Sequence, residues 1–594
     1  MTKSRDTANI IKQPFTQTLG TSNYRAGVNA GNSITSGGNY NVTVGDEAGT
    51  AITTGDNNVA IGYQALSTED ANGNNVAVGY RALKTLNVGA NGLNTAVGVD
   101  AGTSMTTGAT NSLFGTFSGD ALTDGAENTA LGYNTLSTEQ RGKGIVAVGW
   151  KALQTSNLGS SAYAYNTAVG YLAGAAVTTG TENTLIGGAA GDALTTSNAN
   201  VALGRLALSA ETTSNGNTAI GAEALKNQNV GSGDARNTAV GLLAGANIST
   251  GIKNVILGSR AGDALTDADN NIAIGESALS TDTLGSKSVA IGDSALYAQN
   301  FTSATDTYNV AVGFEAGNVM TTGTNNTFIG GLSGDSNTDG NTNTAVGSQT
   351  LRGNQRGDKN TAIGYKALID MNPSGNVASH NTAVGFVAGH AVTTGLRNTF
   401  FGSNAGSNVT TGSDNVCVGY DAICVSSGDG DQIVIGNDVD SLAGNTFTFG
   451  NNSIGRVSNL FSTNATWSRT SDERIKKDIQ TNTDCGLAFV NDLRTVTYKW
   501  KAPSEHPEEF KSYNALKTEA SHTEKMYGFI AQEVKSALDT HNITNFNGWN
   551  VASEDQGSQQ GISYEMFIMP LVKAVQELSE KNDALEARIA TLEG

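Results

Sequence analysis

The sequence predicts an all-β repeat solenoid, a parallel β-roll or β-helix, followed by a small α+β domain that ends in a coiled coil. Three observations support this fold class. Of the 74 glycines, 68 precede residue 471. A five-residue motif returns about every 17 residues as far as Gly436. After residue 470 the composition changes, and 33 of the last 124 residues are charged. Together they indicate a long repeat region joined to a different, smaller domain.

The repeat motif is Asn-(Thr/Val)-Ala-(Val/Ile/Leu)-Gly, as in Asn94 to Gly98. We count 24 such units between residues 23 and 436, and every fourth step is lengthened from 17 to between 19 and 21 residues. The units therefore form six quartets of about 72 residues. The residue four after the closing glycine is Gly in the first two members of a quartet and Leu in the next two, as in Gly102, Gly119, Leu136 and Leu153.

Each motif reads as a short strand that ends in a turn. Branched residues alternate with alanine at period two, so they occupy opposite faces of the strand, and the glycine permits the turn. One unit cannot bury its own apolar face, so the units must stack as rungs spaced by about 4.8 Å. Twenty-four rungs would make a rod about 115 Å long.

Two columns of the stack carry further expectations. Asparagine precedes the strand in 21 of the 24 units, and stacked asparagine amides can form a hydrogen-bonded ladder. The central alanine becomes bulky in the second unit of five quartets, and we expect these side chains to fill a groove between subunits: Leu113, Leu185, Ile256, Phe328 and Phe400.

The Asn-Thr-Ala-Val-Gly repeats of residues 23–436 resemble the coils in the head domains of trimeric autotransporter adhesins. Heads of that family are left-handed parallel β-rolls that assemble as trimers, so the resemblance implies a homotrimer. The unit here is longer than the usual coil of that family. Whether each chain winds its own solenoid or three chains share each coil stays open.

The longer fourth steps predict loops that protrude from the rod at 157–165, 227–236, 298–308 and 371–380. Loops on a rigid scaffold commonly carry binding sites. Aromatic and histidine side chains in these loops are candidates for contact with a host-surface glycan or protein receptor, and the alternative is that the loops are solvated spacers. The candidates are Tyr163, Tyr165, Phe301, Tyr308 and His380.

Charge and composition exclude several function classes. The net charge is −19 and no Lys/Arg-rich tract stands out, so we expect no binding to nucleic acid and no membrane insertion. Three cysteines are too few for a disulfide framework or a zinc site. The aspartates between Asp429 and Asp440 lack a full calcium-loop signature. We expect no cofactor and no metal, and synthesis and assembly in a host cytoplasm, since the first 20 residues contain no secretory apolar run.

The second domain opens with Ser-Asp-Glu-Arg-Ile-Lys at residues 471–476, continues to Tyr-Gly-Phe-Ile-Ala-Gln-Glu-Val at 527–534, and ends in a heptad-like tail. This order of landmarks resembles the endosialidase-type intramolecular chaperone, a self-cleaving peptidase domain at the C-terminus of phage tail fibres and tailspikes. The resemblance covers nearly all of residues 471–594. It implies that the domain trimerises the upstream shaft and then cleaves the chain between Thr470 and Ser471.

The catalytic pair implied by this resemblance is Ser471 as nucleophile and Lys476 as base, a dyad that would act once per chain. A lysine can serve as base when its surroundings favour the neutral amine. Five residues on one helix separate two side chains by about 140°, so the pair needs a turn or contact across subunits. Lys477 is a competing base, and the possible supporting residues are Asp472, Arg474, Gln532 and Glu533.

The last residues predict a coiled coil over 570–594. Apolar residues and one asparagine recur in alternating steps of four and three from Leu571 to Leu592, and Asn582 lies in this seam. A polar seam residue favours a role in setting the register of an oligomer, and the alternative is a single amphipathic helix packed on its own domain.

We therefore expect a phage tail fibre or tailspike located in the virion and made of four parts. Residues 1–22 attach to the tail or baseplate, 23–436 form the solenoid shaft, 437–470 form the neck or tip, and 471–594 form the self-cleaving chaperone. Two alternatives stay open. One is a bacterial trimeric surface adhesin, and the other is a tailspike with polysaccharide depolymerase activity, although the repeats single out no carboxylate pair.

Overall fold

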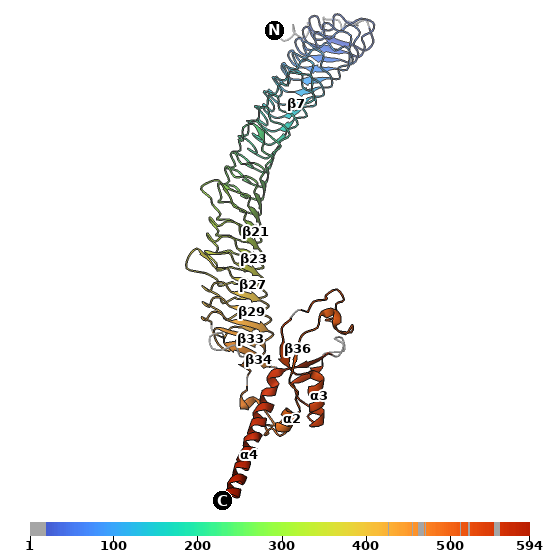
Figure 1. Cartoon of the computed structure of the whole chain (residues 1–594). Coiled ribbons are helices and arrows are strands. Elements are labelled where there is room, and N and C mark those ends of the chain that lie inside the picture. Colours follow the sequence, from blue (N-terminus) through green and yellow to red (C-terminus); the bar gives the residue numbers. More distant parts are fainter. Residues whose placement is uncertain are drawn as a thin grey trace. The chain divides into compact units, whose positions relative to one another are not determined.

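The computed structural model describes residues 20–425, 427–453, 455–460, 468–469, 471–510, 512–520, 523–551 and 559–594. The chain divides into two compact units, Met1–Thr470 and Ser471–Gly594. We call them the shaft unit and the C-terminal unit. Figure 1 shows the shaft unit as a stack of coils, and the C-terminal unit as a smaller body with helices and short strands. The N-terminal residues 1–19 and Thr470 lie outside the described residues.

The shaft unit is a parallel β-solenoid of about 25 turns, which confirms the predicted fold class. One short strand from each coil joins a single long sheet, and neighbouring coils pair in parallel. The strands are β1 Tyr24–Ala26, β2 Val42–Val44, β3 Val59–Ile61, β4 Val76–Val78, β5 Thr95–Val97, β6 Ser112–Phe114, β7 Thr129–Leu131, β8 Val146–Val148, β9 Thr167–Val169, β10 Thr184–Ile186, β11 Val201–Leu203, β13 Thr218–Ile220, β15 Thr238–Val240, β16 Val255–Leu257, β17 Ile272–Ile274, β19 Val289–Ile291, β21 Val310–Val312, β22 Thr327–Ile329, β23 Thr344–Val346, β25 Thr361–Ile363, β27 Thr382–Val384, β28 Thr399–Phe401, β29 Val416–Val418, β31 Ile433–Gly436 and β33 Thr446–Asn451.

The repeat motif fixes both the register and the inner face of this sheet. Each residue pairs with the equivalent residue of the next motif, as Thr167 does with Thr184. The small central residue points inward and is fully buried, as Ala96 and Ala168 are. The branched residues on either side face outward and are partly exposed, for example Leu131 at 48 %. Alanine therefore lines the core at the sheet, and the branched residues form the outer face.

The expectation that the bulky central residues fill a groove between subunits is wrong. Leu113, Phe328 and the others are 0 to 1 % exposed and lie in the core of their own solenoid. They occupy the space that glycines leave four residues after the closing glycine. A Cβ on Gly102 would lie 2.8 Å from Leu113 Cδ1, and one on Gly119 would lie 3.0 Å from Leu113 Cδ2. In the next two coils Leu136 and Leu153 fill the core from that position instead.

The closing glycine is required by both backbone conformation and space. Gly98 has a φ of +146°, and a Cβ there would lie 2.3 Å from the carbonyl oxygen of Gly115 in the next coil. The residue four further on also has a positive φ, +60° at Gly102 and +53° at Leu136. Leucine accepts the cost of this left-handed conformation where its side chain is fully buried.

The asparagine column ties each coil to the next mainly through side chain to backbone bonds. Asn41 Oδ1 accepts from the backbone N–H of Asn58 at 2.9 Å, and Asn41 Nδ2 donates to the backbone carbonyl oxygen of Gly55 at 2.8 Å. Amide to amide bonds occur as well, such as Asn183 Nδ2 to Asn166 Oδ1 at 3.3 Å. Buried polar groups need such partners, so the asparagine satisfies the buried backbone at the strand entrance.

The longer fourth coils are fastened in two ways. Their extra residues form short parallel pairs with the preceding coil, and a buried carboxylate in that coil accepts hydrogen bonds from them. Glu211 accepts from Gln228 Nε2 at 3.1 Å and from the N–H of Val230 at 3.2 Å. Phe301, proposed above as a receptor contact, is 7 % exposed and belongs to the interior, which corrects that expectation, whereas Tyr165 is 60 % exposed. The paired segments are β12 Ser214–Asn215 with β14 Gly233–Asp234, β18 Gly285–Ser286 with β20 Thr305–Asp306, and β24 Gly357–Asp358 with β26 Val377–Ala378.

The shaft unit closes with a change of strand direction. β30 (Ala422–Ile423) pairs with β32 (Val439–Asp440) in the last regular coils. β33 then pairs in parallel with β31 and antiparallel with β34 (Gly455–Leu460), and β34 pairs with β35 (Ser468–Arg469). An antiparallel hairpin ends the parallel stack.

The C-terminal unit combines short helices, two antiparallel strand pairs and one long helix. Its elements are η1 Glu473–Ile475, α2 Leu487–Asn491, β36 Val496–Tyr498, η2 Pro503–Glu505, β37 Met526–Gly528, α3 Ala531–Thr540, β38 Trp549–Val551, β39 Gln560–Ile562, η4 Tyr564–Phe567 and α4 Ile568–Glu593. β36 pairs with β37 and β38 with β39, both antiparallel. Its small core contains the fully buried Phe489 together with Val534 and Leu538. The Glu577 carboxylate on α4 accepts from the N–H of Leu487 at 2.7 Å, which joins α2 to α4.

Within the described ranges, no helix has the length and apolar character needed to cross a bilayer. The same residues contain no group of three or more His, Cys, Asp or Glu side chains placed to hold a metal ion.

Candidate active site at the start of the C-terminal unit

A single 3₁₀ turn, η1, shapes the first residues of the C-terminal unit. Asp472 caps it, because Asp472 Oδ1 accepts from the N–H of Arg474 at 2.9 Å. The Arg474 guanidinium returns to the same carboxylate, with Nη2 at 2.6 Å from Oδ2 and Nε at 3.0 Å from Oδ1. These hydrogen bonds lower the pKa of Asp472 and raise that of Arg474. The charged pair therefore holds the turn closed.

The turn brings Ser471 and Lys476 together. The backbone N–H of Lys476 donates to the carbonyl oxygen of Glu473 at 3.0 Å, which reverses the chain direction. Lys476 Nζ then lies 2.5 Å from Ser471 Oγ and donates to it. A spacing of five would separate the two side chains on a regular helix, and this turn overcomes it within one chain. The arrangement can pass a proton between a hydroxyl and an amine.

The four supporting residues named above fall into two places. Asp472 and Arg474 pair with each other beside the dyad. Gln532 and Glu533 lie in the first turn of α3. Glu533 pairs with Arg494, whose Nη2 lies 2.5 Å from Glu533 Oε1, and this ion pair lowers the pKa of Glu533. Gln532 is exposed. The structure thus gives Glu533 a role in joining α3 to the loop before β36.

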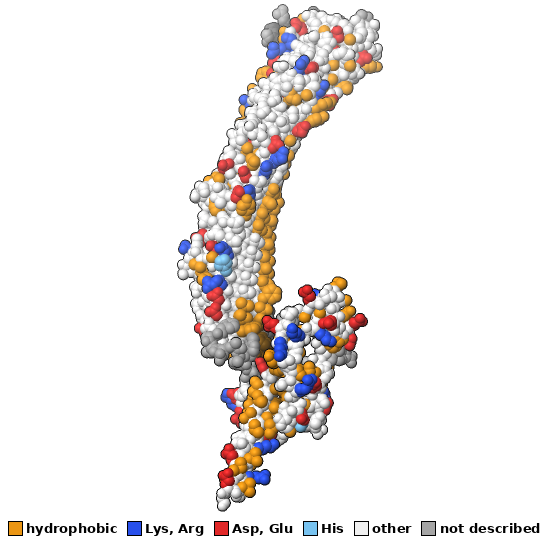
Figure 2. Space-filling view, viewed as in Figure 1, with side chains coloured by type: hydrophobic (Ala, Val, Ile, Leu, Met, Phe, Trp, Pro, Cys, Tyr) orange, Lys and Arg blue, Asp and Glu red, His pale blue; other side chains and the backbone are white. Residues whose placement is uncertain are grey.

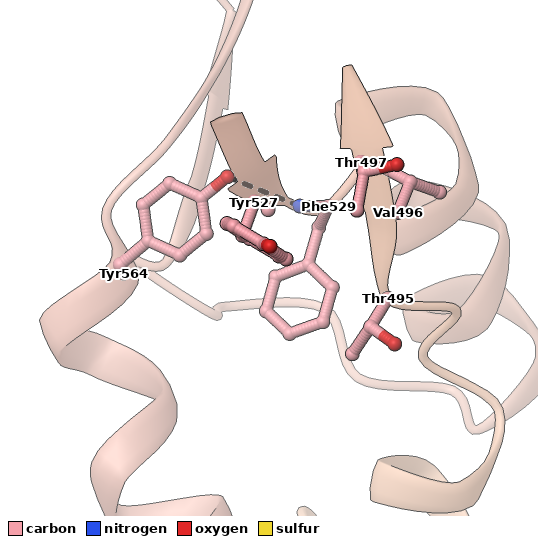
Figure 3. Close-up of a pocket in the computed structure, with 7 residues that line it drawn as sticks. Thr495, Val496, Thr497, Tyr527, Phe529 and Tyr564 are labelled. Atoms are coloured by element: carbon pink, nitrogen blue, oxygen red, sulfur yellow. Dashed lines mark hydrogen bonds between the residues drawn. The ribbon is translucent and has the colours of Figure 1, made fainter. Parts of the chain in front are cut away.

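A second feature of the unit is a hollow of about 500 Å³ beside the antiparallel pair β36 and β37 (Figure 3). The backbone N–H of Phe529 donates to the hydroxyl oxygen of Tyr564 at 3.0 Å, and the two rings stack with centroids 5.8 Å apart. A Cβ on Gly528 would lie 2.1 Å from that hydroxyl. The Tyr-Gly-Phe motif at 527–529 therefore needs glycine so that Tyr564 can approach. The lining residues are Thr495, Val496, Thr497, Tyr527, Gly528, Phe529 and Tyr564.

Sequence reasoning did not identify Tyr564, Arg494 or Glu577 as residues that organise this unit. Each contacts a partner at least 35 positions away in the sequence. Such contacts leave no periodic or local signal in a single chain.

Residues 471–543 match the family model described as the chaperone of endosialidase. The match begins at Ser471, the residue that also opens the C-terminal unit. No curated protein and no solved structure matches the chain.

These findings define the class of protein. Residues 471–543 of the C-terminal unit match a peptidase-type chaperone domain of the endosialidase kind, and this match indicates a self-cleaving domain. A β-solenoid shaft of repeats precedes it. A repeat shaft followed by a domain of this kind is similar to the arrangement of a tail fibre or tailspike.

Proposed function

We propose that the chain is the subunit of a homotrimeric phage tail fibre or tailspike that recognises a receptor on the host surface. The C-terminal unit aligns three chains and then cuts itself off between Thr470 and Ser471, so that residues 1–470 form the mature fibre. The observation that carries the proposal is the 2.5 Å contact between Lys476 Nζ and Ser471 Oγ at the first residue of the family match.

The chemistry follows from the position of Ser471 next to the bond that is cut. Ser471 Oγ attacks the carbonyl carbon of Thr470, and Lys476 in its neutral form takes the hydroxyl proton. The Lys476 ammonium returns this proton to the Ser471 nitrogen as the peptide C–N bond breaks, which leaves an ester on Oγ and a free amine on Ser471. Water then hydrolyses the ester. After hydrolysis Thr470 ends in a free carboxylate and Ser471 has no peptide bond left to attack, so each chain reacts once.

The surroundings of the dyad favour cleavage after assembly. Ser471 and Lys476 are exposed in the single chain, and the neighbouring Ile475 and Ile479 are 68 % and 62 % exposed. Exposed apolar side chains of this size are suited to packing against another subunit. An amine that is removed from water is more easily held in its neutral form. Assembly would therefore supply the dry surroundings that the base needs.

Two apolar surfaces support a homotrimer. The first is the outer face of the long sheet, where Figure 2 shows a stripe of hydrophobic side chains that is most continuous in the part of the shaft nearer its C-terminal end. It includes Leu203, Leu257 and Phe401, which are 40 to 57 % exposed. The second is the seam of α4, where Leu571, Leu585 and the other apolar members are 52 to 83 % exposed. Similar repeats on identical chains present the same spacing, so copies can pack along the stripe.

The chaperone has a physical task in this scheme. Six similar quartets allow chains to associate one coil or one quartet out of step, because a shifted pairing presents nearly the same side chains. A C-terminal clamp that joins the three chains at one end fixes their register. Its removal then leaves the assembled shaft without the element that guided assembly, so the shaft is held kinetically.

Receptor contact and virion attachment complete the proposal. Tyr163, Tyr165 and Tyr308 are 45 to 60 % exposed on the longer coils, which supports a host glycan or protein as partner. The N-terminal segment 1–22 would attach the fibre to the tail or baseplate, which places the protein in the virion after assembly in the host cytoplasm.

The test is the intact mass of the full-length protein beside a Ser471→Ala variant. We expect the wild type to yield a product ending at Thr470 and a fragment beginning at Ser471, and the variant to stay uncut. Light scattering on both proteins should report trimers. An uncut wild-type trimer would remove the peptidase activity and keep the assembly role, and an uncut monomer would remove both.

A further inference from the structure

Two cysteine thiols meet inside the last regular coils of the shaft unit. Cys417 is the central residue of β29, the position that alanine holds in most coils, and Cys424 follows β30. Both are 0 % exposed. Their sulfur atoms lie 2.9 Å apart, within hydrogen-bonding distance. The two residues are seven positions apart in the sequence, so one coil supplies both.

The contact arises because this coil departs from the repeat. In the third coil of the preceding quartets, the residue four after the closing glycine is a buried leucine with a positive φ, as in Leu136 at +53° and Leu208 at +53°. Here that residue is Ile423, which lies in the extended strand β30 and pairs with Asp440. The inward position therefore passes to the next residue, and the Cys424 side chain enters the core beside Cys417.

We propose that Cys417 and Cys424 form an intrachain disulfide on exposure to an oxidising medium that contains a low-molecular-weight disulfide. One cysteine thiolate attacks the disulfide of the oxidant and releases its first thiol. The second cysteine sulfur then attacks the mixed disulfide and releases the second thiol. The two protein thiols lose two protons and two electrons, which the two released thiols carry away.

In a reducing cytoplasm we expect both thiols to stay reduced, so that the disulfide forms only after the protein meets an oxidant. The hydrogen bond with Cys424, together with burial, holds the pKa of Cys417 well above its usual range. Thiolate is the reactive form. The raised pKa lowers the thiolate fraction, so oxidation of the pair is slow and needs prolonged exposure to the oxidant. Once formed, the bond ties β29 to the segment after β30, close to the hairpin that ends the shaft. A crosslink restricts the unfolded chain and so stabilises this end.

The experiment uses the full-length protein, incubated with glutathione disulfide and, in parallel, with the smaller oxidant diamide. The protein is then denatured, alkylated with N-ethylmaleimide and digested with trypsin. Residues 398–456 form one tryptic peptide that contains both Cys417 and Cys424, and residues 478–494 form another that contains Cys485. We expect the first peptide to be unalkylated and about 2 Da lighter, and the second to be alkylated.

Cys417→Ala supplies the matched control, because alanine is the usual residue at this strand centre. In this variant, oxidation should leave no internal bond and produce no rise in the thermal midpoint, whereas the wild type should melt at a higher temperature after oxidation. The proposal would be overturned if both cysteines of the wild-type protein were still alkylated after prolonged treatment with each of the two oxidants. A stable mixed disulfide on one cysteine would also overturn it, because the second sulfur would then have failed to reach the first.

Discussion

Lys476 Nζ lies 2.5 Å from Ser471 Oγ, whereas Lys477, the next residue, is exposed beyond the turn. The 3₁₀ turn at Glu473–Ile475 determines which of the two lysines contacts the serine, because it folds the chain back so that the residue five positions after Ser471 lies beside it. Local backbone geometry therefore places Lys476, the base proposed above, beside Ser471.

Replacement of the two lysines tests this choice directly. Lys476→Gln should abolish cleavage, because glutamine keeps a polar side chain of similar length and cannot take the Ser471 proton. Lys477→Gln should cleave at a rate within about twofold of the wild type, since its removal leaves the contact intact. The cleaved fraction is followed over time by mass spectrometry. Loss of cleavage in Lys477→Gln alone would assign the base to Lys477.

Asp472 provides a graded test of the turn. Asp472→Ala removes both the helix cap and the partner of Arg474, and the loss of a cap costs about 1 kcal/mol. We expect cleavage to slow by about fivefold. Asp472→Asn keeps an oxygen that can cap the turn and loses only the ion pair, so its rate should fall less. Equal rates in all three proteins would show that the turn is held by other contacts.

A buried and an exposed aromatic residue in the shaft should differ in their effect on stability. Phe328 is 1 % exposed and lies against the space left by Gly317 and Gly334. Phe328→Ala should cost about 3 to 5 kcal/mol, because it leaves a cavity. Tyr297→Ala, at a side chain that is 44 % exposed, should cost much less. Calorimetric melting of the two variants provides the comparison, and equal losses would contradict the described core.

The repeat itself could be predicted from sequence because its chemistry is local. The closing glycine must accept a positive φ beside the next coil, and the 17-residue spacing brings like residues into register. The spacing of Ser471 and Lys476 required either a turn or contact across subunits, and a turn is present. The identity of the pair came from a resemblance to a family, since the two residue types alone are common neighbours.

The alternation alone could not predict which face of each strand points into the core. Period two separates Ala96 from its branched neighbours and does not say which side faces inward. The sequence evidence for the inward face lay in the position four residues after the closing glycine. Gly102 and Gly119 leave space there, and the Leu113 side chain fills it. Only the pairing of these columns in space shows that the bulky residue belongs to the core and not to a subunit contact.

The buried carboxylates were missed for a different reason. Glu211 is 0 % exposed and holds the longer fourth coil through its hydrogen bonds. One glutamate in a quartet of about 72 residues resembles an ordinary surface charge. Its recurrence seven residues after the third closing glycine, as Glu69, Glu139, Glu211 and Asp282, was the available sign.

Asp120 should make the stability of the shaft depend on pH. Burial, with a contribution from the charge of Asp100, raises the pKa of Asp120 to about 6, and Asp120 Oδ1 is buried without a partner in the described structure. The folded state therefore binds the proton more tightly than the unfolded state, whose carboxyl has a pKa of about 4. The contribution of Asp120 to the free energy of unfolding is therefore highest at low pH and falls as the pH rises from about 4 to about 6.

Asp120→Asn should remove this dependence. The variant should be more stable than the wild type by about 1 kcal/mol above pH 7, a figure reduced for solvent screening, and equal to it near pH 4. Asp414 is the control of opposite sign, because its hydrogen bonds with Arg397 lower its pKa. Asp414→Asn should lower the thermal midpoint at neutral pH, and the difference should shrink as the pH falls below the ordinary carboxyl range. A pH-independent gain in Asp120→Asn would exclude titration as the cause.

The seam of α4 should control assembly and, through it, cleavage. Leu585 is a seam residue that is 54 % exposed in the single chain, and Ala584 is its exposed neighbour outside the seam. Leu585→Glu places a charge at each copy of the same seam position, where like charges repel and burial is costly. We expect loss of the trimer by light scattering and a fall in cleavage of at least tenfold. Ala584→Glu adds the same charge on the solvent side and should assemble and cleave as the wild type does. Efficient cleavage by a monomeric Leu585→Glu protein would show that the dyad acts in one chain without the surroundings that assembly provides, and would separate the peptidase step from trimerisation.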